Sequence, residues 1–138
     1  MYGSVARSLV RRAVEALNAG DVEPALRYYA EDATIEFPGD HSWEATYEGK
    51  DEIERFVRRV IRAGIKFQIH EVVVKGPPWN QIGFVRFSVH ARDDDGNIVY
   101  SNRGVQFLKG AWGKIRHEEI YEDTQKVAAF DEYLGVST

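Results

Sequence analysis

Hydrophobic residues in the first part of the chain recur at the spacing of amphipathic helices. Over residues 4–19, one face of the expected helix carries Val5, Leu9, Ala13, Ala16 and Leu17. Over residues 50–63, a second apolar stripe consists of Ile53, Phe56, Val57, Val60 and Ile61. Between them, Asp21 is suited to begin a short helix, and residues 33–37 form a brief strand that stops at Pro38. This part of the chain therefore predicts three helices and one short strand.

After Gly64 the apolar period changes to strict alternation, which indicates strands. We expect strands over residues 65–75, 81–92, 98–109 and 114–122, followed by a helix over residues 124–134. Segments rich in glycine, proline, aspartate and asparagine separate these strands, as turns require. Helices followed by a run of antiparallel strands predict an α+β fold in which the helices cover one face of a sheet.

Length and composition fit one globular domain over residues 1–138. Hydrophobic residues make up 43% of the chain, and no apolar run approaches the ~20 residues that a membrane span needs. The net charge of -4 and the lack of a basic stripe argue against a nucleic-acid surface. The chain has no cysteine, and its first residues lack a signal-peptide pattern. We expect a cytoplasmic protein that binds neither nucleic acid nor membrane.

Three short segments occur in an order that resembles the opening of a known superfamily. Residues 17–21 read Leu-Asn-Ala-Gly-Asp, residues 29–37 read Tyr-Ala-Glu-Asp-Ala-Thr-Ile-Glu-Phe, and residues 47–49 read Tyr-Glu-Gly. This order resembles the nuclear transport factor 2-like superfamily, and within it the SnoaL-like and ketosteroid isomerase-like proteins. The resemblance implies a cystatin-like cone of three N-terminal helices on a curved, mostly antiparallel sheet, with a short C-terminal helix and a small-molecule pocket. It implies no single reaction, because fold does not fix function.

The strand over residues 81–92 has one apolar and one mixed face. The apolar face carries Val85, Phe87 and Val89, and the mixed face carries Phe84, Arg86, Ser88 and His90. From alternation alone, the apolar face would cover the core and the mixed face would be exposed. The resemblance favours the reverse, with pocket-facing side chains at Arg86, Ser88, Asn102, Gln106, Glu118 and Ile120. It also implies a homodimer through a convex sheet face made of Val85, Phe87, Val89, Val105 and Phe107.

Symmetric pairing of the strands would bring polar side chains together in the pocket. A symmetric turn over residues 93–97 would place Arg86 opposite Gly104, which has no side chain in the way. A symmetric turn after the next strand would place Gln106 opposite Glu118. We therefore expect Arg86 to reach over Gly104 towards Glu118 and to form a polar centre with it.

Glu118 is the leading acid–base candidate, with Arg86 beside it. An apolar cavity raises the pKa of a carboxyl group and suits it to catalysis near neutral pH, whereas an adjacent arginine lowers that pKa. Two alternatives remain: a purely structural Arg86–Glu118 bridge, or a register in which Glu119 faces inwards instead. A buried, partly unpaired carboxylate would favour an enzyme, and a fully paired bridge would favour a binding protein. The apolar walls are expected to include Phe37, Phe84 and Ile120.

Loop and strand-end residues complete the candidate set. His41 and Trp43 lie in a loop that often borders the pocket mouth in the resembled family, and His90 near a strand end is a third catalytic candidate. The alternative is an exposed loop histidine and a surface-packed tryptophan. The 4 histidines show no tight metal-ligand spacing, and the acidic run at residues 93–97 favours a hairpin turn over a calcium loop. We expect neither a metal ion nor a cofactor.

The chain lacks the reactive groups of the characterised enzymes that it resembles. Phe37, Ala13 and Gly104 stand where a ketosteroid isomerase needs its base, its tyrosine donor and its protonated aspartate. Ser88 and Ile120 stand where limonene epoxide hydrolases have aspartates. We expect a pocket for a largely apolar metabolite and, if there is catalysis, cofactor-independent acid–base chemistry of the isomerase, cyclase, dehydratase or epoxide hydrolase type. The alternative is a non-catalytic binding or accessory domain.

Overall fold

The computed structural model describes residues 2–135 and has the α+β fold that the sequence predicts. In chain order, its elements are α1 (Tyr2–Ala19), α2 (Val22–Leu26), β1 (Tyr29–Phe37), β2 (Ala45–Glu48), α3 (Gly49–Arg62), β3 (Lys66–Lys75), β4 (Gln81–Arg92), β5 (Ile98–Ala111), β6 (Lys114–Glu122) and α4 (Thr124–Leu134). The short strand β2 was not indicated by the sequence pattern, and β1 begins four residues earlier than expected.

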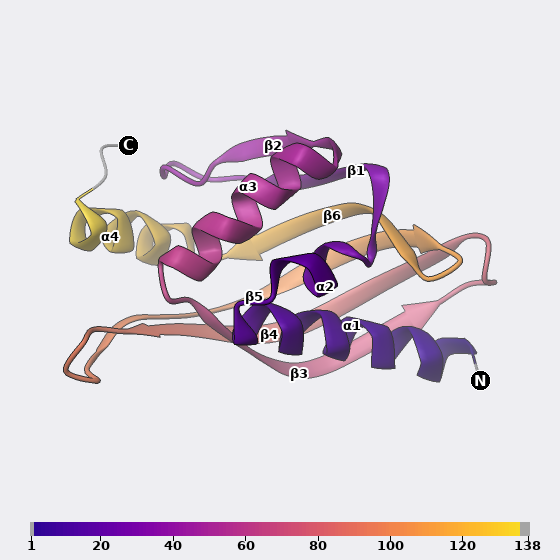
Figure 1. The fold of residues 1–138 in the computed structure, drawn as a ribbon, viewed down its shortest axis with the longest axis horizontal. Coiled ribbons are helices and arrows are strands. Elements are labelled where there is room, and N and C mark those ends of the chain that lie inside the picture. Colours follow the sequence, from indigo (N-terminus) through magenta and orange to yellow (C-terminus); the bar gives the residue numbers. More distant parts are fainter. Residues whose placement is uncertain (1, 136–138) are drawn as a thin grey trace.

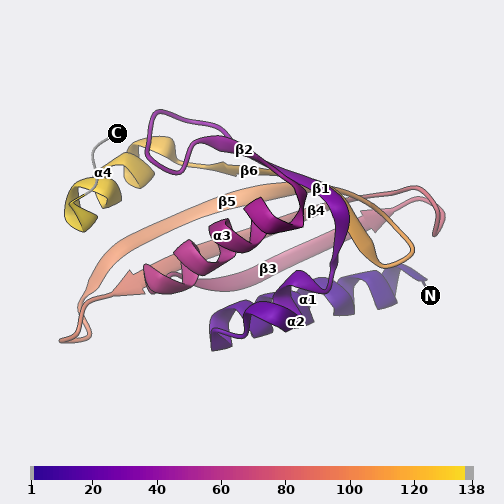
Figure 2. The same cartoon turned by 45° about the horizontal axis from the view of Figure 1, so that its top comes forward.

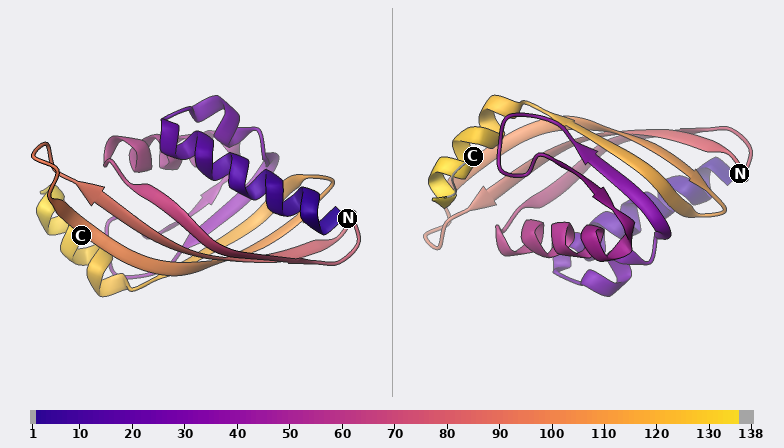
Figure 3. Two further views of the ribbon diagram at one scale, coloured as in Figure 1. Left: turned by 90° about the horizontal axis from the view of Figure 1, so that it is seen from below. Right: turned by 90° about the horizontal axis from the view of Figure 1, so that it is seen from above.

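The strands form a six-stranded curved sheet in the order β2-β1-β6-β5-β4-β3 (Figure 1). Neighbouring strands are antiparallel except β1 and β6, which run parallel. The helices α1, α2 and α3 lie on the concave side, and α4 lies at the opposite end of the molecule from the start of α1 (Figure 2). Seen from below and above, the strands curve around the helices (Figure 3). None of the helices within residues 2–135 has the length and apolarity needed to cross a membrane.

Local chemistry ends the helices and turns the strands where the sequence indicated. Gly20 after α1 and Gly64 after α3 have φ angles of 78° and 73°, a left-handed conformation that glycine adopts at low cost. Between β4 and β5, Asp93 Oδ1 accepts hydrogen bonds from the backbone N–H groups of Asp95 and Asn97, at 3.0 and 2.9 Å. This geometry is that of the expected hairpin turn.

β4 turns its apolar face to the core, so the interpretation drawn from the resemblance is wrong for this strand. Val85, Phe87 and Val89 are buried on the concave face and are not available for a convex dimer surface. The residues that alternate with them lie on the convex face, and they are Phe84, Arg86, Ser88 and His90. The four residues expected in the pocket from this strand therefore lie outside it.

A β-bulge explains the difference. Arg92 of β4 pairs with Ile98 of β5. The next pair joins Ala91 to Tyr100, so Val99 is an extra residue in β5. Because side chains of paired residues share a face, a shift of one residue moves every side chain of β4 to the other side of the sheet relative to β5. The symmetric turn assumed from the sequence is therefore correct at the tip of the hairpin and wrong beyond it.

The bulge places Phe87, and not Arg86, opposite Gly104. A Cβ atom on Gly104 would lie 2.8 Å from Phe87 Cζ and would also collide with the backbone oxygen of Tyr121. Gly104 therefore makes room for a buried aromatic ring and for the neighbouring strand. It does not provide a path for an arginine side chain across the pocket.

β5 and β6 have the faces that the sequence predicted. Their concave face carries Asn102, Gln106, Glu118 and Ile120, and the convex face of β5 carries Val105 and Phe107. The pairing itself is shifted by two residues from the symmetric one, since Gln106 lies opposite Ile120. An even shift leaves every side chain on its expected face.

Candidate functional site

A cavity of ≈ 90 Å³ lies between the concave face of the sheet and the helices above it. Most of its walls are aliphatic or aromatic, and they include Leu17, Phe37, Phe56, Val60, Phe67 and Ile120. Its polar side chains are Tyr29, Trp43, Tyr100, Gln106, Glu118 and Glu122. Within the described part of the chain, the cavity is lined by no lysine, arginine or histidine. An apolar cavity with a few converging polar groups is the usual form of a small-molecule site.

Glu118 is buried in this cavity, with 3% of its surface exposed. The Tyr29 hydroxyl donates a hydrogen bond to Glu118 Oε1 at 2.8 Å, and Gln106 Nε2 donates one to Oε2 at 3.4 Å. Pairing of two strands brings Tyr29 and Glu118 together: Tyr29 begins β1, and Glu118 lies on β6, which pairs with β1. The sequence therefore identified Glu118 and Gln106 correctly as neighbours on the concave face.

The charge state of Glu118 is set by burial. Removal from water raises the pKa of the Glu118 carboxyl to about 7, although the hydrogen bond from Tyr29 opposes this rise. Arg86, the expected partner, instead pairs with Glu71 on the convex face, where its Nε atom lies 2.9 Å from Glu71 Oε1. In the described part of the chain, Glu118 takes part in no ion pair. The sequence left open a fully paired Arg86–Glu118 bridge or a buried carboxyl group without that partner. Among the described residues, the structure has the buried carboxyl group without an arginine partner.

Glu122 is a second carboxyl group that lines the same cavity, and the residue is partly buried. The Tyr100 hydroxyl donates to Glu122 Oε1 at 2.7 Å, and Asn102 Nδ2 donates to the same atom at 3.3 Å. Burial raises the pKa of Glu122 to about 7, again against a lowering effect of the tyrosine hydrogen bond. Asn102 does not itself line the cavity; it holds Tyr100 and Glu122 in place.

Neither Tyr29 nor Glu122 was among the expected site residues. The alternation that turns Glu118 and Ile120 inwards also turns Glu122 inwards, so the sequence did contain a signal for it. Glu118 and Glu122 are four residues apart on one strand, which separates their Cα atoms by about 13 Å. They are therefore two distinct acid–base groups along one cavity wall, each with its own tyrosine.

The loop between β1 and β2 closes one side of the cavity. Trp43 lines the cavity and is 2% exposed, so the alternative of a surface-packed tryptophan is wrong. Its indole N–H donates to Asp131 Oδ1 of α4 at 3.0 Å, and the Arg59 guanidinium lies 3.8 Å from the centre of its ring. These contacts hold the loop against α3 and α4.

His41 is buried in this loop and is not an exposed loop histidine. Its Nδ1 atom accepts a hydrogen bond from the Trp43 backbone N–H at 3.2 Å, so Nε2 carries the proton and donates to the Pro38 carbonyl oxygen at 3.1 Å. Its ring packs against Phe37. His41 does not line the cavity, and these contacts give it the role of fixing the loop that presents Trp43.

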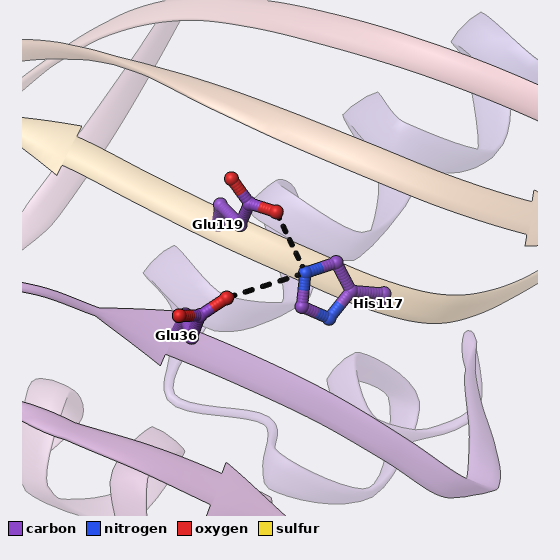
Figure 4. A group of neighbouring side chains, drawn as sticks. All are labelled: Glu36, His117 and Glu119. Carbon is purple, nitrogen blue, oxygen red and sulfur yellow. Dashed lines mark hydrogen bonds and ion pairs between the residues drawn. The ribbon is translucent and has the colours of Figure 1, made fainter.

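Glu119 faces away from the cavity and belongs to a convex-face cluster of Glu36, His117 and Glu119 (Figure 4). His117 Nε2 lies 2.8 Å from Glu119 Oε2 and 3.6 Å from Glu36 Oε2. His117 Nδ1 lies 2.6 Å from the Thr34 hydroxyl oxygen, so both ring nitrogens are already engaged. Hydrogen bonds from Tyr121 and His117 lower the pKa of Glu119, which is the opposite of the shift at Glu118. The cluster is a surface hydrogen-bond network separate from the cavity.

Comparison with known proteins agrees with this fold. Residues 10–118 match the family model of the SnoaL-like domain. No curated protein matches the chain. Among solved structures, an NTF2-like protein of unknown function from Burkholderia pseudomallei K96243 is 21% identical, with a TM-score of 0.71 over 87% of this chain and 92% of that chain.

Two further solved structures are similar over nearly the whole chain. A putative polyketide cyclase from Xanthomonas campestris pv. campestris is 20% identical, with a TM-score of 0.67 over 94% of this chain and 98% of that chain. TerC, co-crystallized with polyporic acid, is 18% identical, with a TM-score of 0.75 over 94% of this chain and 98% of that chain. At such identities, the likeness establishes the fold and leaves the reaction open.

Proposed function

Because the chain belongs to the SnoaL-like family, we propose that it binds a small, largely apolar metabolite in its cavity and moves a proton on that ligand without a cofactor. The observation that carries the proposal is Glu118, a carboxyl group buried among apolar walls with hydrogen-bond donors and, within residues 2–135, no basic partner. The names of two similar structures, a putative polyketide cyclase and TerC co-crystallized with polyporic acid, are in keeping with a small-molecule site.

Glu118 would act as the general base. Its ionised form can take a proton from a carbon atom next to a carbonyl group, and its protonated form can return the proton elsewhere on the ligand. With a pKa of about 7, both forms are populated near neutral pH. Tyr29 fixes the orientation of the carboxyl group through Oε1, and Gln106 contacts Oε2, the oxygen that would face the ligand.

Glu122 would complement this base from the other end of the cavity. A carboxyl group whose pKa is about 7 is partly protonated at neutral pH and can donate a hydrogen bond or a proton. Because the Cα atoms of the two residues lie about 13 Å apart along the strand, Glu122 would not reach the atoms that react at Glu118. It would instead hold a second hydroxyl or carbonyl group of the ligand, and a water-poor site strengthens that hydrogen bond.

The cavity also restricts the kind of ligand. Because no basic side chain lines it within the described residues, a carboxylate or phosphate on the ligand would meet two carboxyl groups and no compensating charge. A neutral molecule with one or two carbonyl or hydroxyl groups on an apolar frame fits these walls better. We therefore propose a neutral, enolisable ketone or enol as the substrate class.

A deuterium-exchange experiment tests the proposal. The protein would be incubated in deuterated buffer with a panel of small cyclic ketones, and deuterium at the carbon next to the carbonyl would be measured by mass spectrometry. We expect exchange above background with the wild type, and at least ~10²-fold slower exchange with Glu118→Gln. Glu119→Gln is the matched control, because it removes the neighbouring carboxyl group from the convex face and should leave exchange unchanged.

A non-catalytic binding protein is the second candidate. The observation that favours it is that each buried carboxyl group already holds a tyrosine hydroxyl, so the two pairs also serve as structural cross-links between strands. In that case the ketones would bind in the cavity, and the wild type and Glu118→Gln would show the same background exchange.

A further inference from the structure

A second cavity of ≈ 70 Å³ lies beneath the N-terminal half of α1, over the ends of β4, β5 and β6. Small residues create this space: Ala6 of α1, Gly83 of β4 and Ala111 of β5. Its other walls include Leu9 and Val74. Because an apolar cavity holds water poorly, the hydrocarbon part of a ligand is the natural occupant of such a space.

The second cavity adjoins the first. Val10, Ala13, Leu108 and Ile115 line both cavities, so four aliphatic side chains form the partition between them. Val10 and Ala13 come from α1, Leu108 comes from β5 and Ile115 comes from β6, so the partition lies where the helix meets the sheet. A ligand that occupies both spaces would pass between these side chains.

The two cavities differ in the chemistry that they offer. The first has Glu118, Glu122 and their tyrosines. The second has the exposed residues Lys109 and Lys114 at its rim, and its walls are mostly apolar apart from Tyr28 and Gln81. Each cavity alone is smaller than the ~150 Å³ apolar cavity that accommodates benzene, whereas together they are comparable to it. A ligand longer than the first cavity therefore has one apolar direction in which to extend, beneath α1.

We propose that the two cavities form one site for an elongated amphiphile, with a neutral hydroxyl or carbonyl head group at Glu118 and an alkyl tail beneath the N-terminal half of α1. The proposal rests on ligand binding in the first cavity, as proposed above, and adds the tail-binding site and the class of ligand. It does not depend on whether the bound molecule reacts.

Alanine methyl groups report on each cavity separately. Ala25 lines the first cavity alone, Ala13 lines both, and Ala6 and Ala111 line the second alone. Protein labelled at its alanine methyl groups would be titrated with primary alcohols from butan-1-ol to heptan-1-ol and followed by NMR. We expect butan-1-ol to shift the Ala25 and Ala13 signals, and heptan-1-ol to shift those of Ala6 and Ala111 as well. Affinity should rise about fourfold for each added methylene group, because each buried methylene contributes a similar transfer free energy.

Filling the second cavity should shorten the preferred chain. In Ala6→Phe, the rise in affinity should end at a shorter chain than in the wild type, so that heptan-1-ol binds at least tenfold more weakly while butan-1-ol binds equally well. Ala111→Leu fills the same space from the sheet and should act in the same way, which guards against misfolding of one variant. Arg11→Phe, which adds the same ring to an exposed position of α1, is the control and should keep the wild-type profile.

Two results would overturn the proposal. One is a shift of Ala25 by every alcohol with no chain-length-dependent shift at Ala6 or Ala111. The other is a wild-type chain-length profile in both folded variants, Ala6→Phe and Ala111→Leu. If no alcohol shifts Ala25, then ligand binding in the first cavity fails as well, so failure of the tail-binding site and failure of the proposed function give different spectra.

Discussion

At the scale of single residues, burial of Glu118 and Glu122 in an apolar cavity has a cost in stability. A carboxyl group whose pKa is higher in the folded state than in the unfolded state lowers the free energy of unfolding when it ionises. For a rise from 4.5 to about 7, stability is lost as the pH increases through this window, and the loss stays constant at higher pH. Both carboxyl groups therefore weaken the fold at neutral and alkaline pH.

Glu118→Gln should stabilise the protein above neutral pH. The amide keeps the shape of the side chain and can still accept the hydrogen bond from Tyr29, but it cannot ionise. Since one pKa unit corresponds to about 1.4 kcal/mol, the gain over the wild type should grow from pH 4.5 to about 7 and approach roughly 3 kcal/mol. Urea denaturation at pH 5 and pH 8 measures the free energy of unfolding under both conditions.

Glu119→Gln should change the free energy of unfolding in the opposite direction. The pKa of Glu119 is lowered, so its ionised form stabilises the fold at neutral pH and this contribution disappears as the pH falls. This variant should therefore be less stable than the wild type at pH 8. If Glu118→Gln also loses stability on going from pH 5 to pH 8 relative to the wild type, Glu118 is not held protonated by burial.

At the scale of elements, Asp131 joins α4 to the loop between β1 and β2. Its side chain is completely buried and accepts three hydrogen bonds: from the Ser42 backbone N–H at 2.6 Å, from the Ser42 hydroxyl at 2.7 Å and from the Trp43 indole at 3.0 Å. Arg59 of α3 donates to the Ser42 carbonyl oxygen at 3.0 Å. Two helices thus fix one loop, and the loop in turn presents the Trp43 ring to the cavity.

Asp131→Ala should loosen this wall of the cavity. Three donors would lose their acceptor in a buried place, and each such loss typically costs about 1–3 kcal/mol, so the free energy of unfolding should fall by roughly 3–5 kcal/mol. Trp43 should become more exposed, which shifts its fluorescence to longer wavelengths. Asp131→Asn keeps one acceptor oxygen and should lie between the two. An Asp131→Ala protein with wild-type stability and fluorescence would show that α4 does not hold the loop.

Sequence patterns predicted the bounds of α1, α3, α4 and the four later strands closely, because glycine, proline and aspartate at turns act locally, but they missed β2 and the first residues of β1. The face of β4 depended on Val99, whose role as an extra residue in the β4–β5 pairing has no local signal. Glu118 was found because β5 and β6 differ from symmetric pairing by an even number of residues. Its contact with Tyr29 joins residues 89 positions apart and required the three-dimensional pairing of β1 with β6.

At the scale of the whole molecule, the convex sheet face has an apolar centre. The residues that form it are Ile82, Phe84, Val105 and Phe107. The rings of Phe84 and Phe107 lie 5.3 Å apart and contact each other across β4 and β5. Contiguous apolar surface of this kind is uncommon on monomers, so we still expect a homodimer through this face. The residues expected to form it now include Phe84 in place of Val85, Phe87 and Val89.

Phe84→Asp should separate the dimer without unfolding the chain, because Phe84 is exposed in the isolated chain. Phe87→Asp is the matched variant on the same strand and should fail to fold, because it would bury a charge in the core. Light scattering at micromolar concentration gives the mass of each species, and circular dichroism reports folding. A wild-type protein that is monomeric under these conditions would contradict the expectation.

The parallel pairing of β1 with β6 has a consequence for how the chain is made. The ribosome releases β1 early, but the strand beside it, which carries Glu118, is among the last segments to emerge. Until then β5 lacks its neighbour at one edge, and the apolar surfaces that will enclose the cavity stay exposed to solvent or to chaperones. Long-range pairing of this kind also slows folding. A pause or truncation shortly before residue 114 should therefore release an aggregation-prone intermediate, and the cavity would form only after β6 and α4 have emerged.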